Sequence, residues 1–315
     1  MVRRRLVVVV GVFAGLVGVV VFVASSVARP AHSSKFKVTA TIHVGGAPVG
    51  VAVDSSDHGV YVSDGASGTV SQIRGTVVIR QIAVASGGIA FLRVAPGHVV
   101  YAAASAQNAL EVIHGGSVVD MIPVGSLPLG VALSGNGKTG YVANNQDDTV
   151  SVITNRVVTA TIPVGSGPNS LAVDPATNTV YVTDDTGSSV SVIKGASVSS
   201  IPVGNGPLGV AVDPGTHTVY VGNANSNSVS VIRDDKVTST IKVDKGPDEV
   251  AVDPGTHNVF VVDRGSNQLS VIAKGKVVAT IKVGRNPYDV AVDPSTHTAY
   301  VTNRGSSTVS VIKKK

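Results

Sequence analysis

Six residues near the C-terminal end of the chain have side chains suited to chemistry, and they recur at a spacing of forty. They are Asp248, Glu249, Arg264, Tyr288, Asp289 and Arg304. Clustered carboxylates can bind a hard cation such as Ca²⁺ or exchange protons with a substrate. The alternative interpretation is a solvated cluster of surface ion pairs, which proteins commonly carry. We treat the six as candidate ligand-binding residues and assign none of them to catalysis or to a metal.

Whether these side chains lie close together depends on the fold, which a repeat of about forty residues predicts. An aromatic residue recurs at Tyr61, Tyr101, Tyr141, Tyr181, Tyr220, Phe260 and Tyr300, with successive spacings of 40, 40, 40, 39, 40 and 40. Each copy contains short runs of Val, Ile, Tyr and Thr that are broken by Gly, Pro, Asn and Asp, which is typical of β-strands and turns. Seven such copies predict an all-β, seven-bladed propeller of four-stranded blades.

Antiparallel succession within a blade places the six candidates on one face. We label the strands of each blade a to d from the axis outward, and the d–a and b–c turns then share a face. Asp248, Glu249, Tyr288 and Asp289 follow d–a turns, and the two arginines lie in b–c turns. Because they belong to the sixth and seventh copies, we expect them to gather at the rim of blades 6 and 7.

Two other repeated polar positions have structural explanations. Five histidines stand three residues before the strand-b aromatic: His58, His98, His217, His257 and His297. Corresponding sites on neighbouring blades should lie on the order of 10 Å apart, too far for one zinc ion whose ligands lie at about 2 Å. The Asp or Asn three residues after the aromatic is expected to bond the backbone of its own turn.

The two ends of the repeat region predict how the ring closes. The chain begins with a d-type strand at residues 38–44, before any a strand, and its last copy stops at Ile312 after a c-type strand. Pairing of these two strands would complete the seventh blade and remove the exposed edges of an open array. The second copy, around residues 86–104, has lost the usual Asp-Pro turn and is interpreted as a structural blade.

Composition excludes several classes of site and partner. The chain contains no Cys, so disulfides and thiolate chemistry are absent. Nine of the 25 basic residues lie in the first 37 residues or the last three, which leaves 16 against 20 acidic residues in between. A propeller with a net charge of −4 lacks the footprint of a nucleic-acid-binding protein, and no nucleic-acid partner is expected.

The first 28 residues predict export. Three arginines at positions 3–5 precede an apolar run over residues 6–28, which is long enough to span a bilayer. Residues 1–28 are therefore a signal-anchor transmembrane helix or, since Ser26-Val27-Ala28 resembles a cleavage site, a signal peptide. Residues 29–37 form a linker and residues 38–315 the propeller. The propeller is expected outside the cytoplasm, either secreted or held at the membrane.

The repeat sequence resembles the YVTN family of β-propeller repeats, found in YncE-like and surface-layer-type proteins. Tyr300-Val301-Thr302-Asn303 carries the name motif, and Tyr181-Val182-Thr183-Asp184 differs from it at one position. The resemblance covers residues 38–312. It implies an exported, often seven-bladed propeller and provides no catalytic signature or cofactor.

We therefore expect a monomeric extracytoplasmic scaffold that binds a cell-surface protein or glycan, with no cofactor and with no enzymatic activity as the first expectation. The alternative is a propeller hydrolase or lyase, similar to a lactonase, with its site at the rim of blades 6 and 7. No Gly-x-Ser-x-Gly, Walker or His-Glu-x-x-His motif is present.

Overall fold

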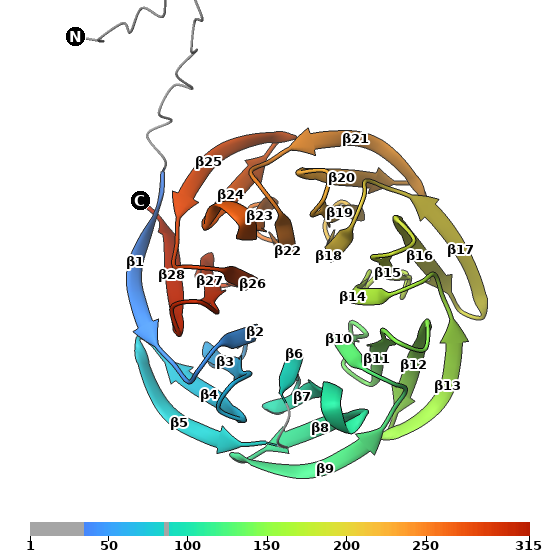
Figure 1. The fold of residues 1–315 in the computed structure, drawn as a ribbon, viewed down its shortest axis with the longest axis horizontal. Coiled ribbons are helices and arrows are strands. Elements are labelled where there is room, and N and C mark those ends of the chain that lie inside the picture. The colour runs from blue at the N-terminus through green and yellow to red at the C-terminus, as the bar shows by residue number, and fades with distance from the viewer. Residues whose placement is uncertain (1–34, 85–87) are drawn as a thin grey trace, which may run out of the picture. The chain divides into compact units, whose positions relative to one another are not determined.

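Seven four-stranded antiparallel sheets stand around a central axis in this computed structural model, which describes residues 35–84 and 88–315 (Figure 1). In six sheets the strands follow chain order from the axis to the rim. The predicted seven-bladed propeller is confirmed. The predicted leader, residues 1–28, lies outside the described residues, and across the described ranges no helix is long and apolar enough to cross a membrane.

Blades 1 to 4 occupy the first half of the repeat region. Blade 1 contains β2 (Pro48–Asp54), β3 (Gly59–Asp64), β4 (Thr69–Arg74) and β5 (Val77–Ala83). Blade 2 contains β6 (Ile89–Ala95), β7 (Val99–Ala104), β8 (Ala109–His114) and β9 (Ser117–Pro123). Blade 3 contains β10 (Pro128–Leu133), β11 (Thr139–Asn144), β12 (Thr149–Thr154) and β13 (Val157–Pro163). Blade 4 contains β14 (Pro168–Val173), β15 (Val180–Asp184), β16 (Ser189–Lys194) and β17 (Ser197–Pro202).

Blades 5 to 7 complete the ring. Blade 5 contains β18 (Pro207–Asp213), β19 (Thr218–Asn223), β20 (Ser228–Arg233) and β21 (Lys236–Lys242). Blade 6 contains β22 (Pro247–Asp253), β23 (Asn258–Asp263), β24 (Gln268–Ala273) and β25 (Lys276–Lys282). Blade 7 contains β26 (Pro287–Asp293), β27 (Thr298–Asn303), β28 (Thr308–Lys314) and, as its outer strand, β1 (Phe36–His43).

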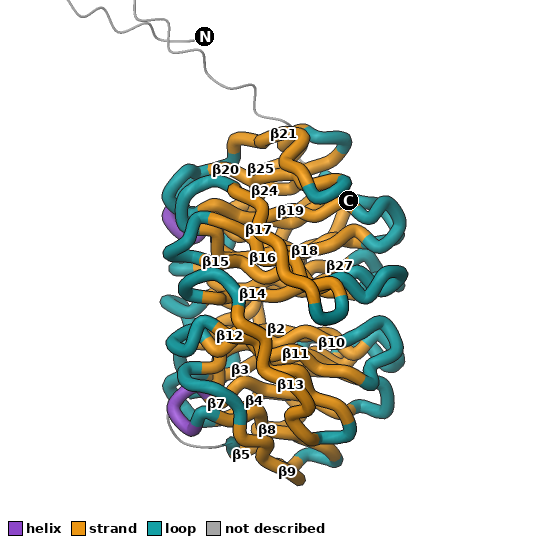
Figure 2. The backbone as a smooth tube through the Cα atoms, turned by 90° about the vertical axis from the view of Figure 1, so that its right-hand side faces the viewer, coloured by secondary structure: helices purple, strands orange, loops and turns teal. Residues whose placement is uncertain are grey.

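The two faces of the propeller differ in the turns that they present. We call the face with the d–a and b–c turns the upper face, and the face with the a–b and c–d turns the lower face. Two short 3₁₀ helices, η1 (Ser105–Gln107) and η2 (Arg264–Ser266), replace b–c turns in blades 2 and 6. Figure 2 shows both of them on the same side of the ring, as the antiparallel order requires.

Strand β1 closes the ring as predicted, although it begins at Phe36, inside the predicted linker. It pairs antiparallel with β28, with Ile42 opposite Val309 and Val38 opposite Ile312 (Figure 1). Ile42 is buried, and Phe36 meets Phe260 of blade 6 edge to face at 5.8 Å between ring centroids. Main-chain pairing and apolar burial therefore join the first and last strands of the ring.

The Tyr-Val-Thr-Asn motif holds blades together from inside. Thr302 Oγ1 accepts the Asp289 N–H (2.9 Å) and donates to the Val49 carbonyl of the next blade (2.7 Å). Ser63 and Thr183 make the same pair of bonds at their own interfaces. A hydroxyl at this position thus links the inner strands at three of the seven interfaces, whereas the other four blades carry Ala, Gly or Val there.

The Asn or Asp of the motif clips strand b to strand c. Asn303 Nδ2 donates to Thr308 (3.1 Å) and Ser310 (2.9 Å), and Asp184 accepts from Ser189 and Ser191 in the same way. The prediction that these side chains bond the backbone of their own turn is wrong in its main partner. The hydroxyls of strand c are the partners, accepting from Asn and donating to Asp, because these side chains are fully buried between strands and need partners there.

Candidate functional site

Tyr288 and the two predicted arginines meet on the upper face of blades 6 and 7. The guanidinium carbons of Arg264 and Arg304 lie 5.0 Å and 5.8 Å from the centre of the Tyr288 ring. Arg264 is held in place by Asp248 at 3.3 Å and by Asn286 Oδ1 at 2.8 Å. Four of the six predicted residues thus form one contact group, in which cations flank an aromatic ring.

In the described turns of the upper face, every Lys and Arg belongs to blades 6 and 7, and one of these turns also holds Asp244. Among the described d–a and b–c turns the cationic residues are Lys245, Arg264, Arg285 and Arg304, which we call the basic patch. Lys245, Arg285 and Arg304 are exposed and Arg264 is partly buried. The opposite side of the face, in blades 3 and 4, carries Asp147, Asp148 and Asp185. Lys245 and Arg285 were not among the predicted residues, although their place in d–a turns was a signal for them.

The three predicted carboxylates lie beneath the basic patch. Asp248, Glu249 and Asp289 are exposed by only 4 %, 2 % and 2 %, so the expectation of a solvated cluster is wrong for them. Asp289 Oδ2 accepts the Val51 N–H (2.8 Å) and its Oδ1 accepts the Val290 N–H (2.7 Å). Glu249 Oε1 has no hydrogen-bond partner among the described residues. Asp289 is therefore occupied by backbone, whereas Glu249 keeps unused bonding capacity.

Burial dominates the ionisation of this layer. Loss of water raises the pKa of Glu249 to about 8, and the neighbouring Asp289 adds to the effect while Arg93 opposes it. Burial also raises the pKa of Asp289 to about 6, again against Arg93. The pKa of Asp248 rises to about 7 for the same reason, despite its contact with Arg264. Burial and the repulsion between Glu249 and Asp289 thus favour a proton on this pair of carboxylates, with the larger upward shift at Glu249.

Arg93 and Phe91 of blade 2 belong to this region, and the sequence analysis overlooked both. In the strand pairing, Arg93 opposite Tyr101 matches Ala52 opposite Tyr61, so it stands where the other six blades have Ala. By the same register Phe91, rather than Ala90, corresponds to Glu249 and Asp289. Phe91 packs against Tyr288 with ring centroids 6.0 Å apart. The a–b turn of the second copy is one residue shorter, so alignment on the strand-b aromatic places Leu92 at the Ala position and hides Arg93.

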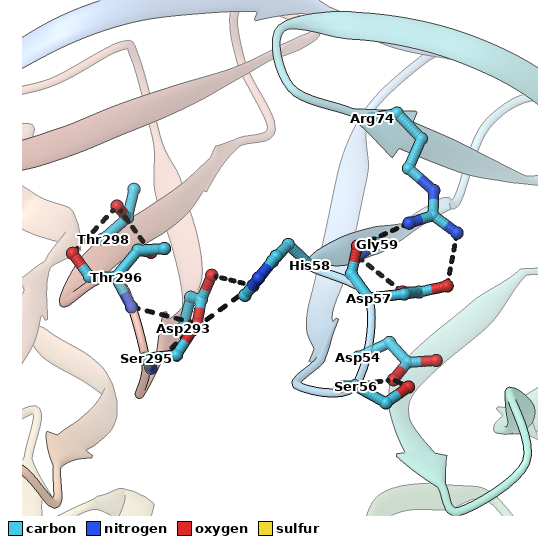
Figure 3. A network of polar contacts seen from close by, with 10 residues as sticks. All are labelled: Asp54, Ser56, Asp57, His58, Gly59, Arg74, Asp293, Ser295, Thr296 and Thr298. Carbon is cyan, nitrogen blue, oxygen red and sulfur yellow. Dashed lines mark hydrogen bonds and ion pairs between the residues drawn. The ribbon is translucent and has the colours of Figure 1, made fainter.

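The five repeated histidines form hydrogen bonds between neighbouring blades on the lower face. Each ring Nδ1 lies at 2.6–2.9 Å from an Asp oxygen of the preceding blade, in the pairs His58–Asp293, His98–Asp54, His217–Asp174, His257–Asp213 and His297–Asp253. Figure 3 shows His58 reaching from blade 1 to Asp293 of blade 7. Each histidine has a positive φ between 53° and 60°. The predicted exclusion of a single shared zinc site agrees with this separate pairing, while the bonds between blades were not foreseen.

The pair His98–Asp54 belongs to a larger group. Asp54, Asp57 and His98 bring ligand atoms within 4.8 Å of one another. Arg74 pairs with Asp57 there and His98 with Asp54, so both carboxylates already have a side-chain partner. We assign no metal to it.

Replacing His217 by Asn should cost about 0.5–1.5 kcal/mol of stability, the usual value of one net hydrogen bond. Asn keeps the left-handed backbone, since Asn178 already occupies the corresponding position with φ 54°. The pKa of Asp174 is raised by burial but lowered more by bonds from the Ala176 N–H and His217, so it falls below its usual value. The stability that ionised Asp174 contributes is present above about pH 4 and is lost as the pH falls through the native pKa of Asp174.

Urea unfolding at pH 7 and pH 3 would measure both effects. The matched control is Asn178→His, which meets Ser134 in place of an Asp and should change stability by less than about 0.5 kcal/mol. Equal losses in the two variants would show that the His–Asp bond contributes nothing.

Comparison with known proteins confirms the fold and leaves the family open. No protein-family model and no curated protein sequence matches this chain. Its structure is similar to virginiamycin B lyase from Staphylococcus aureus, with TM-score 0.79 and 13 % identity over 88 % of this chain and 99 % of that one. A catalytically inactive variant of that lyase with quinupristin gives TM-score 0.80 at 13 % identity, over 88 % and 99 %. Hydrazine synthase from Kuenenia stuttgartiensis gives TM-score 0.71 at 19 % identity, over 85 % and 97 %. Identities this low show a shared propeller fold alone. Because no family model matches, the YVTN resemblance stays a prediction.

Proposed function

We propose that this protein is an exported binding propeller that recognises an anionic glycan through the basic patch on its upper face. The observation that carries the proposal is the one-sided charge, because all four cations of the described upper turns lie on blades 6 and 7. Positive charge gathered at one place attracts and orients an anionic ligand.

The chemistry of the patch supports direct contact with an anion. The Arg304 guanidinium is exposed and makes no side-chain hydrogen bond or ion pair with described residues, so its donors are free for a carboxylate or phosphate. Arg264 is prepositioned by Asp248 and Asn286, which reduces the entropy lost on binding.

The rest of the upper face favours a glycan over a protein. Among the large hydrophobic side chains that are exposed in the described residues, only Leu127 belongs to an upper turn. The others are Val77, Ile79, Val119, Met121, Val157, Val198, Val237 and Val278, all on outer d strands. Protein interfaces usually contain apolar or aromatic anchors at their centre, and the patch offers only the partly buried Tyr288.

Export is the second part of the proposal and rests on residues 1–28. A positively charged start followed by an apolar run over residues 6–28 directs the following domain across the membrane. The propeller would then meet the polysaccharides of the cell surface, either as a secreted protein or held by an uncleaved anchor.

Binding to polygalacturonate, with dextran as the neutral control polymer, tests the glycan proposal. We expect the wild-type protein to bind polygalacturonate, dextran to show no binding, and the double change Arg285→Gln with Arg304→Gln to weaken affinity at least about tenfold. Affinity should also fall as salt rises, because the contact is between exposed charges.

The control variant is Arg156→Gln, an exposed arginine in a c–d turn of the lower face, which should bind like the wild type. Equal binding of dextran, or equal loss in the control, would contradict the proposal. Tighter binding to duplex DNA than to polygalacturonate would replace it with nucleic-acid binding.

A hydrolase or lyase remains the second candidate, supported by Glu249 and Asp289. A protonated acid with an unpaired oxygen near an ionised carboxylate is an arrangement that can donate and accept protons. Lactone turnover that Glu249→Gln abolishes and Asp120→Asn preserves would establish this candidate. Absence of turnover across a lactone panel would remove it.

A further inference from the structure

A cavity of about 340 Å³ runs along the propeller axis below the carboxylate layer. Its walls come from the middle positions of the seven a strands, such as Val51–Val53 and Val210–Val212. None of the first two residues after the d–a turns lines it, so it lies below the layer with Glu249 and Asp289. Val53, Val173 and Val212 are only partly buried, which shows that solvent enters from the lower face.

Arg93 is the only charged residue among those that line this cavity; the other lining residues are Val, Ala and Leu. Its side chain replaces the Ala of the other six blades and therefore projects where they leave space. One guanidinium nitrogen donates to the Leu92 carbonyl at 2.9 Å. No carboxylate of the described residues lies within ion-pair distance of it, so its remaining N–H groups have no protein partner there.

Asp289 and Glu249 interact with the charge of Arg93, but neither makes a hydrogen bond or ion pair with it among the described residues. Both oxygens of Asp289 accept backbone N–H groups, and burial raises the pKa of Glu249, which disfavours its charged form. A partly buried guanidinium with unused donors is costly unless an anion meets it. The apolar walls around it favour hydrocarbon.

We propose that the axial cavity is a second binding site, which takes a small organic monocarboxylate from the lower face. Its carboxylate accepts two parallel hydrogen bonds from Arg93, and its hydrocarbon part packs on the Val, Ala and Leu side chains of the inner strands. The volume lies at the lower end of the range of about 300–1,000 Å³ that is usual for small-molecule sites. This site is independent of the basic patch, which lies on the other face.

Calorimetric titration of the full-length protein with hexanoate, hexan-1-ol and hexylamine tests the charge and the apolar requirement together. We expect hexanoate to bind and the neutral and cationic analogues to bind at least about tenfold more weakly, because only hexanoate can pair with Arg93. Acetate, which keeps the charge and loses most of the hydrocarbon, should also bind more weakly.

Arg93→Ala is the decisive variant, since it restores the residue that six blades already carry and should fold normally. We expect it to lose hexanoate binding by at least about tenfold, while Arg156→Ala and Arg304→Gln bind hexanoate like the wild type. Unchanged binding in Arg93→Ala, tighter binding of hexylamine, or no binding of hexanoate by the wild type would each overturn the proposal. Failure of the glycan experiment would not affect this result.

Discussion

Deletion of residues 38–44 is expected to abolish the folded monomer. These residues supply most of β1, so their loss exposes the whole edge of β28 and opens the ring between blades 7 and 1. An exposed inner strand pairs with other chains. We expect a loss comparable with the total stability of a typical domain, about 5–15 kcal/mol, visible as the disappearance of the cooperative thermal transition or as oligomers in size-exclusion chromatography.

A point change in the same strand separates closure from chain length. Ile42→Asp places a charge at a buried position between blades 7 and 1 and should approach the effect of the deletion. Thr41→Asp, one residue away and exposed, should change stability by less than about 0.5 kcal/mol. A deletion variant that stays monomeric with unchanged melting would refute closure by β1.

Glu249→Gln is expected to stabilise the protein by about 1–3 kcal/mol at pH 8.5. The native pKa of Glu249 is raised by burial to about 8, well above the ordinary value of 4.5. The native state therefore holds a proton that the unfolded state releases. Stability contributed by Glu249 is complete below about pH 4.5 and is lost as the pH rises toward 8, whereas Gln has no such dependence.

Urea unfolding of the wild type and the variant at pH 5 and pH 8.5 measures this difference. We expect the difference between the two proteins to be much smaller at pH 5, because that pH lies close to the unfolded-state pKa of 4.5 and well below the raised native pKa. Asp120→Asn, at a more exposed carboxylate, is the control and should show little change between the two pH values. A variant that is less stable than the wild type at pH 8.5 would mean that native Glu249 is ionised and paired.

The repeat made the architecture predictable because every copy reports the same local structure. Blade number, strand order and closure all follow from the period and from the positions where the repeat starts and stops. The gathering of Arg264, Tyr288 and Arg304 on one face also followed, since the alternation of turns fixes which residues share a face.

The burial of the candidate residues could not be predicted from the repeat. Glu249 and Asp289 occupy a position that is Gly in three other blades, where a Cβ atom would meet the next blade at 2.4–2.8 Å. Their burial therefore depends on how closely blades converge, and no local pattern reports that distance. Arg93 was hidden for a different reason, because the second copy diverges and its register with the others is visible only through strand pairing.

The partners of the histidines were also beyond the sequence pattern. His217 and Asp174 are 43 residues apart, and their contact depends on the rotation between neighbouring blades. Both residue types recur at fixed positions of the repeat, but the sequence does not show that they form a hydrogen bond with each other.

The His–Asp bonds divide the ring unequally. They are present at five of the seven interfaces and missing on both sides of blade 3, where Ala95 and Ser134 replace the Asp, and Lys138 and Asn178 replace the His. Both borders of blade 3 thus lack a hydrogen bond that the other five interfaces have. Amide hydrogens at these borders should exchange with solvent earlier than those at the other interfaces, and the exchange would extend to the axial cavity, since Ala132 and Leu133 form part of its wall.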